Sequence, residues 1–98
     1  MKVSQESSAI DWLFPKTRSR VLALLYMRPE ERWHLRDIAR RVGCALGAVR
    51  RELHGLAKAE VVTEVRDGNR AYFQANTDSP IFADLRGIVL KTVGLADV

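Results

Sequence analysis

Apolar residues recur every three or four positions in four stretches of this chain, a spacing typical of amphipathic helices. The first of these predicted helices begins at Lys16. The second runs from Leu35 to Gly43, because glycine readily adopts the left-handed conformation that ends a helix. The third begins near Ala45 or Leu46, only three or four residues later. The second and third helices must therefore turn sharply relative to each other.

Two β-rich runs, residues 61–66 and 70–75, follow this helix pair. They are joined around Asp67-Gly68-Asn69, and Asp-Gly between such runs is the strongest short-range signal for a β-hairpin. Residues 32–34, ahead of the helix pair, form a short extended stretch at most.

A last helix is predicted from Ser79 and Pro80, since serine caps a helix and proline suits its first turn. The expected order is helix, strand, helix, helix, strand, strand, helix. This is a mainly α fold with a small β-hairpin (α+β), and 98 residues suffice for one domain over 1–98. Its parts are an N-terminal arm or short helix (1–14), the helix pair (35–59), the hairpin (61–75) and the last helix (79–94).

The single cysteine, Cys44, rules out an internal disulfide and any zinc site built on two or more cysteines. The first ten residues lack the apolar core of a signal peptide. The longest apolar run, residues 21–27, is far shorter than the ~20 residues that cross a bilayer. We therefore expect a cytoplasmic protein with no membrane partner and no cofactor.

Positive charge is concentrated in the middle of the chain. The whole sequence has 16 basic and 12 acidic residues, a net charge of +4, whereas residues 16–70 alone have 13 basic and 7 acidic residues, or +6. Twelve of the sixteen basic residues are arginine, whose planar guanidinium binds phosphate and base edges with two hydrogen bonds. The alternative explanation is an ordinary solvated surface that is rich in arginine. The spacing of these residues must distinguish it from a surface that binds nucleic acid.

Two segments resemble the winged helix-turn-helix DNA-binding domain of the ArsR/MarR type of prokaryotic transcriptional regulator. LRDIARRVGCALGAVRREL corresponds to the helix-turn-helix and RDGNRAYF to the wing. More narrowly, LFPKTRSRVLALL, GAVRREL, DGNR and LKTVGLADV are similar to winged-helix regulators that precede a nucleotidyltransferase domain. The resemblance implies binding of double-stranded DNA, with the second helix of the pair in the major groove and the wing on the backbone or in the minor groove. The Gly-Ser pair and paired aspartates of nucleotidyl transfer are absent, so that activity is not expected.

The second helix of the pair presents a basic face. With Val49, Leu53 and Leu56 pointing inward, the outward positions are Gly47, Arg51, His54 and Lys58, with Arg50 at their flank. We expect Arg50 and Arg51 to read bases, because arginine bonds bidentately to guanine in the major groove. His54 would reach a base or a phosphate, Lys58 a phosphate, and the small Gly47 would allow close approach to DNA. The alternative is an ordinary solvated helix face.

Further DNA contacts are expected from the wing and from the first helix of the pair. In the wing these are Arg66, Asn69 and Arg70, near the hairpin tip, which would straddle phosphate or enter the minor groove. A hairpin that is charged only for solubility is the alternative. In the first helix of the pair they are Arg36, Arg40 and Arg41 as phosphate ligands, or else partners in surface ion pairs with Asp37 or Glu52.

The two ends of the chain are more apolar than a small core requires, which favours a homodimer. The residues expected to form its interface are Ile81, Phe82, Leu85, Ile88, Val89 and Trp12. The alternative is that the last helix closes the core of a monomer. A two-fold dimer would read two half-sites ~34 Å apart on one face of the duplex.

No set of residues in the sequence suggests catalysis. There is no Ser/His/Asp arrangement, no glycine-rich phosphate loop and no convincing carboxylate pair, so we expect no enzymatic activity. His34 and Cys44 lie on different predicted elements, which disfavours a metal site. The alternative function is a protein-interaction module that docks on a separately encoded nucleotidyltransferase or another partner, with little DNA binding.

Overall fold

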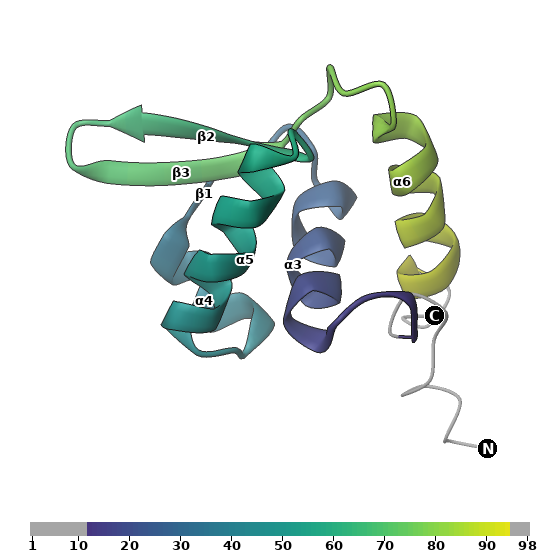
Figure 1. The fold of residues 1–98 in the computed structure, drawn as a ribbon, viewed down its shortest axis with the longest axis horizontal. Coiled ribbons are helices and arrows are strands. Elements are labelled where there is room, and N and C mark those ends of the chain that lie inside the picture. The colour runs from purple at the N-terminus through teal and green to yellow at the C-terminus, as the bar shows by residue number, and fades with distance from the viewer. Residues whose placement is uncertain (1–11, 95–98) are drawn as a thin grey trace.

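The computed structural model describes residues 12–94 and confirms the α+β class and the expected order of elements (Figure 1). After the helical residues Trp12 and Leu13, the elements are α3 (Lys16–Met27), β1 (Trp33–His34), α4 (Leu35–Val42), α5 (Leu46–Lys58), β2 (Val62–Asp67), β3 (Arg70–Ala75), α6 (Phe82–Val89) and the π-helical turn η1 (Leu90–Gly94). No helix within this range combines the length and apolarity that a membrane span requires.

Helix α3 lies between α5 and α6, while the β2–β3 hairpin projects from the side of α5 (Figure 1). The strands form one antiparallel sheet in the order β1-β3-β2. The short stretch at residues 33–34 is therefore a true edge strand, in which Trp33 pairs with Phe73. This pairing fixes the base of the hairpin against the start of α4, so the hairpin is held at a defined position beside the helix pair.

A single hydrophobic core joins the helices to the sheet. Its fully buried large side chains include Leu22, Leu25, Ile38, Leu53 and Phe73, each at most 2% exposed. The apolar stripes that predict α3, α4 and α5 all supply residues to this core, because each amphipathic helix must cover its apolar side. The opposite faces of α4 and α5 are thereby turned toward solvent.

The sharp turn between α4 and α5 depends on Gly43. This residue has φ 69° and ψ 34°, the left-handed conformation expected after a helix. The Nη1 of Arg20 donates a hydrogen bond to the Val42 carbonyl at 3.0 Å, which satisfies one exposed end group of α4. Helix α5 begins after Ala45, whose side chain cannot cap it.

The last helix begins two residues later than the sequence predicts. Helix α6 starts at Phe82, and Ile81 occupies the capping position. The Ser79 hydroxyl instead accepts a hydrogen bond from the Ile81 N–H at 3.3 Å, within the turn that precedes the helix. A serine oxygen serves a tight turn as readily as a helix start, so the Ser-Pro pair placed the boundary too early.

Tyr26 links α3 to the chain entering the hairpin. It is fully buried, and its hydroxyl donates a hydrogen bond to the Val61 carbonyl at 2.6 Å. We expect Tyr26→Phe to lower the free energy of unfolding by ~0.5–1.5 kcal/mol, because one buried hydrogen bond is lost while the Val61 carbonyl still accepts from the Asn76 N–H at 3.1 Å. Urea unfolding at neutral pH measures this loss. The matched control is Tyr72→Phe, since within residues 12–94 Tyr72 makes only ring contacts, and its loss should be much smaller.

Burial also raises the pKa of Tyr26 above its ordinary value of 10.0. The folded protein therefore favours the neutral phenol. Its contribution to stability is complete below about pH 10 and falls as the pH rises toward the folded-state pKa. Tyr26→Phe should remove this part of the alkaline destabilisation, and equal alkaline slopes in the two proteins would contradict the assignment.

Candidate nucleic-acid interface

The basic face predicted for α5 is exposed. Gly47, Arg50, Arg51, His54 and Lys58 are all solvent-exposed, and on the other side of the helix Val49 and Leu53 are fully buried. Nothing lies within 4 Å of the position that a Cβ would occupy at Gly47, so this part of the helix is open to a partner. The amphipathic pattern therefore placed this surface correctly.

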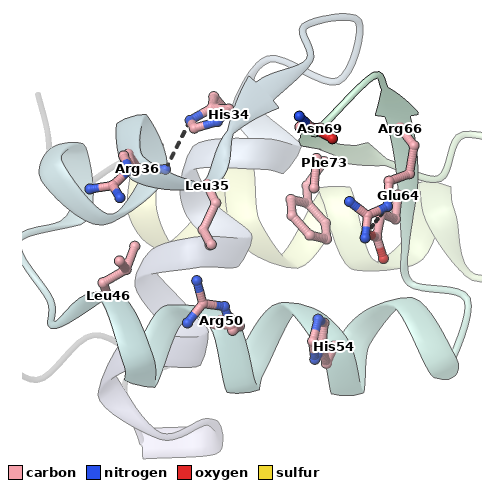
Figure 2. A pocket seen from close by; sticks show the side chains of 11 residues that line it. His34, Leu35, Arg36, Leu46, Arg50, His54, Glu64, Arg66, Asn69 and Phe73 are labelled. Carbon is pink, nitrogen blue, oxygen red and sulfur yellow. Dashed lines mark hydrogen bonds and ion pairs between the residues drawn. The ribbon is translucent and has the colours of Figure 1, made fainter.

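Arg50 lies at one flank of this face, and Arg51 lies on its outward ridge. Arg50 and His54 line a hollow that α5 shares with α4 and the hairpin (Figure 2). Arg51 lines a different hollow, mostly apolar and formed with residues of α3 and α6 such as Leu22 and Ile81. Consecutive residues of a helix project in directions about 100° apart, so these two arginines would contact different parts of a bound ligand.

A cavity of about 360 Å³ lies between α4, α5 and the hairpin (Figure 2). We call it the arginine cavity, and its lining residues are His34, Leu35, Arg36, Leu46, Arg50, His54, Glu64, Arg66, Asn69, Ala71 and Phe73. Two polar residues in this lining, His34 and Glu64, were not among the DNA contacts expected from the sequence. Strand alternation could have found Glu64, because it stands two residues before Arg66 and therefore on the same face of β2.

The two hairpin arginines lie on opposite faces of the ribbon. Arg66 pairs in register with Ala71, and both line the arginine cavity. Arg70 pairs with Asp67, one position along, so these two side chains project from the other face. The sequence placed Arg66 and Arg70 together at the tip, and the register instead directs only Arg66 toward α5.

The three arginines of α4 have different environments. The Nη2 of Arg40 donates to Asp37 Oδ1 at 2.9 Å. An ion pair with Asp37 was one of the alternatives to a phosphate contact that the sequence allowed. The guanidinium of Arg41 lies 4.9 Å from the centre of the Trp33 ring. Arg36 lines the arginine cavity, and its backbone N–H donates to the Nδ1 of His34 at 3.3 Å.

Glu52 is not paired with an arginine of α4. Its Oε1 instead accepts from the Nε of Arg18 at 2.7 Å, which ties α5 to α3. This contact holds a charged side chain of α5 away from the exposed face. The face consequently has basic residues and no acidic one.

The twelve arginines divide into two groups. Four of them, Arg36, Arg50, Arg51 and Arg70, have no side-chain hydrogen bond, ion pair or ring contact with any residue in the range 12–94. The other eight contact a carboxylate (Arg18, Arg28, Arg40, Arg66), a carbonyl (Arg20, Arg86) or an aromatic ring (Arg32, Arg41). All four unpartnered arginines come from α4, α5 or the hairpin.

The residues expected at a dimer interface are only partly available. Trp12, Ile81 and Ile88 are 79%, 48% and 38% exposed. Phe82 packs against Tyr26 with 5.4 Å between ring centres, and Leu85 is half-buried beside the same core. Val89 is fully buried in the core of this chain. Contrary to expectation, Val89 cannot belong to an exposed surface, because the monomer core already covers it.

Across the described residues, no three His, Cys, Asp or Glu side chains are placed to hold a metal ion. Cys44 is half-buried in the turn between α4 and α5, with its Sγ 3.7 Å from the Val42 carbonyl. Its surroundings are therefore those of a packed turn residue.

Comparison of the chain with protein-family models and with curated proteins gives no match. Solved structures do match. The AntR antimony-specific transcriptional repressor aligns with a TM-score of 0.67 at 25% identity, over 87% of this chain and 73% of that one. The homodimeric winged helix-turn-helix DNA-binding domain of Mb0332 from Mycobacterium bovis, a possible ArsR-family transcriptional regulator, aligns with a TM-score of 0.62 at 23% identity, over 97% and 81%. This chain has a winged helix-turn-helix fold.

A further neighbour, AF1382 from Archaeoglobus fulgidus, aligns with a TM-score of 0.66 at 18% identity, over 90% of this chain and 92% of its own. These similarities confirm the resemblance to winged-helix regulators. In DNA-binding proteins of this fold, the helix in the position of α5 is called the recognition helix and the hairpin in the position of β2–β3 is called the wing. AntR and Mb0332 are described as transcriptional regulators and not as enzymes, and nothing in these comparisons supports a nucleotidyltransferase partner.

Proposed function

We propose that this protein is a cytoplasmic, non-enzymatic transcriptional regulator that binds double-stranded DNA as a homodimer. The observation that carries the proposal is the group of four unpartnered arginines on α4, the recognition helix and the wing. Duplex DNA is a densely charged polyanion, and neutralising its phosphates with arginine releases bound counterions. A surface that keeps its guanidinium groups free of internal partners is suited to this partner.

The exposed face of the recognition helix supplies the reading group. Arg51 projects next to Gly47 and Lys58 on the ridge opposite the buried residues of α5. A helix in the major groove directs this ridge at base edges, where a bidentate arginine–guanine contact discriminates by ~1–3 kcal/mol. Phosphates at the margins of the groove would be contacted by Lys58, Arg40 and Arg41. The wing would contact the duplex through Arg70 and Asn69. His54 would reach a base or a phosphate.

We expect Arg51→Ala to reduce affinity for the preferred duplex by ~5- to 150-fold, because one bidentate base contact is lost. Affinity for random duplex should fall much less. Selection from a random duplex pool, followed by fluorescence anisotropy on the selected sequence, measures both effects. Arg28→Ala is the control, because that arginine pairs with the exposed Glu31 beyond the end of α3. If Arg51→Ala left both affinity and preference intact, α5 would not be the reading helix.

Self-association through α6 is the second part of the proposal. Ile81, which caps α6, and Ile88 within the helix are both exposed, and Trp12 is also exposed. The description of Mb0332 as homodimeric supports the same arrangement.

We expect Ile88→Asp to convert a dimer into a monomer, because a carboxylate would have to be desolvated in an apolar interface. Binding to a duplex with two half-sites ~34 Å apart should weaken in parallel. Ala83→Asp adds the same charge to another face of α6 and should leave the dimer intact. Sedimentation equilibrium distinguishes these results, and a wild-type chain that is monomeric at all concentrations would contradict the dimer.

A further inference from the structure

A second hollow, larger than the arginine cavity, is formed by residues of α3, α5 and α6. We call it the apolar hollow, because most of its lining is apolar and includes Phe14, Leu22, Leu56, Val61, Ile81 and Leu85. Its volume is about 550 Å³, within the ~300–1,000 Å³ typical of small-molecule sites. Leu22 is buried in the core, whereas Ile81 is 48% exposed, so the hollow extends from the core to the surface.

Gly55 leaves space in this hollow from the side of the recognition helix. It lies in the interior of α5, where glycine is less favourable than alanine because it loses more backbone freedom on folding. Its φ is not positive, and nothing lies within 4 Å of the position that a Cβ would occupy. Neither the backbone nor close packing therefore requires a glycine here, and its missing side chain keeps the hollow open.

The charges around the apolar hollow suit one negative group. Arg18 and Glu52 both line it and pair with each other, with 2.7 Å between Nε and Oε1. Arg51 also lines it, is exposed, and has no side-chain hydrogen bond, ion pair or ring contact among residues 12–94. Arg51 is one helical turn from Gly55, so the free cation and the open space lie on the same side of α5. A guanidinium group binds a carboxylate through two parallel N–H donors.

We propose that the apolar hollow binds a small amphiphilic carboxylic acid, with its apolar body in the hollow and its carboxylate on Arg51. The consequence for regulation rests on the proposed DNA-binding function, in which Arg51 reads a base. One guanidinium cannot hold a carboxylate and a guanine edge at once, so the bound acid withdraws Arg51 from DNA. By linkage, the acid and the preferred duplex weaken each other's binding by the same factor.

The first test uses 1-naphthoate, a rigid apolar ring system with one carboxylate, in isothermal titration calorimetry with the full chain. Arg51→Gln should weaken its binding by about three- to tenfold, because the ion pair is lost while the apolar contacts remain. The neutral analogue 1-naphthalenemethanol should bind Arg51→Gln and the wild type equally.

Arg50→Gln is the matched control for charge. It removes the same charge from the adjacent residue, which lines the arginine cavity instead, and should leave naphthoate binding unchanged. Equal losses in Arg50→Gln and Arg51→Gln would show a non-specific attraction of the anion to a basic chain and would overturn the site.

The second test fills the hollow. Gly55→Leu should weaken naphthoate binding by about tenfold or more, because the new side chain occupies its space. The same variant should melt ~2–8 °C higher, since leucine has the higher helix propensity, so the loss would not come from misfolding. Gly87→Leu is the control, because Gly87 has equally open surroundings in α6 and does not line the hollow. Unchanged naphthoate binding by a folded Gly55→Leu would overturn the site.

A second copy of the chain is the competing occupant, because Ile81 belongs both to the hollow and to the proposed dimer surface. Ile88→Asp is expected to be monomeric and does not alter the lining. It should therefore bind naphthoate at least as tightly as the wild type. Weaker binding would mean that two copies build the site together, and would overturn a site within one chain.

The third test separates this inference from the proposed function. Saturating naphthoate should weaken binding of the wild type to its preferred duplex by ~5- to 150-fold, the factor expected for the lost base contact, and should not affect Arg51→Gln. A chain that bound naphthoate but no duplex would support the site and contradict the proposed function. A chain that bound DNA but no naphthoate would overturn this inference alone. Unchanged DNA affinity in saturating naphthoate would overturn the competition for Arg51.

Discussion

Replacing Leu53 with alanine is expected to lower the free energy of unfolding by ~2–5 kcal/mol, the cost of the lost burial plus the cavity left behind. Leu53 is fully buried and belongs to the same core as Ile38 and Phe73. Domains of this size have a free energy of unfolding of only ~5–15 kcal/mol, so the substitution would remove a large part of the stability of the protein. The effect should exceed that of any exposed-site variant of the chain, because α5 is fixed to the core by few residues.

Urea unfolding followed by circular dichroism measures this loss, with Leu46→Ala as the matched control. Leu46 is in the same helix and undergoes the same chemical change, but it is only half-buried and lines the arginine cavity. Its loss should be about half as large, since the apolar area that it removes from water is smaller. Equal losses at both positions would contradict the assignment of Leu53 to the core, because the higher helix propensity of alanine cannot destabilise α5 at either position.

The contrast between Leu53 and the arginines shows what the sequence could predict. Helix periodicity assigns Leu53 to the inside and Arg51 to the outside of α5, and both assignments hold in the structure. The left-handed turn at Gly43 and the hairpin at Asp67-Gly68 were predictable for the same reason, because local backbone chemistry determines them.

Partners that are distant in sequence could not be predicted in this way. Arg18 and Glu52 form an ion pair across 34 residues. Ion pairs within one helix follow from spacing, as for Arg40 and Asp37, but this one requires the packing of α3 against α5. Which arginines remain free is therefore a property of the tertiary fold. Composition established only that arginine is abundant.

The arginine cavity was hidden for a related reason. Helical projection shows that Arg50 and Arg51 are neighbours, but it does not show that the wing stands beside Arg50 and α6 beside Arg51. That distinction depends on the pairing of β1 with β3, which fixes the hairpin next to the start of α4. A two-residue strand carries too little pattern to be recognised before its partner is known.

The binding of one protomer to duplex DNA is expected to weaken ~10³-fold between 50 and 200 mM monovalent salt, if that protomer neutralises about six phosphates. The cations expected to neutralise phosphates are Arg36, Arg41, Arg50, Arg66, Arg70 and Lys58. The physical reason is that each neutralised phosphate releases condensed counterions, and this release is less favourable when the bulk salt is concentrated. Fluorescence anisotropy on a duplex of random sequence gives the slope without any knowledge of the operator.

A double variant tests whether the surface itself carries this dependence. Arg36 and Arg70 lie on opposite sides of the wing and have no side-chain partner among residues 12–94, so replacing both with glutamine should disturb no internal contact. The slope should flatten by about two units, whereas Lys91→Gln, which removes one positive charge from η1 on the side away from the wing (Figure 1), should leave it unchanged. A wild-type affinity that hardly changed with salt would mean that phosphates contribute little to binding. The surface formed by α4, α5 and the wing would then have to recognise a partner other than nucleic acid.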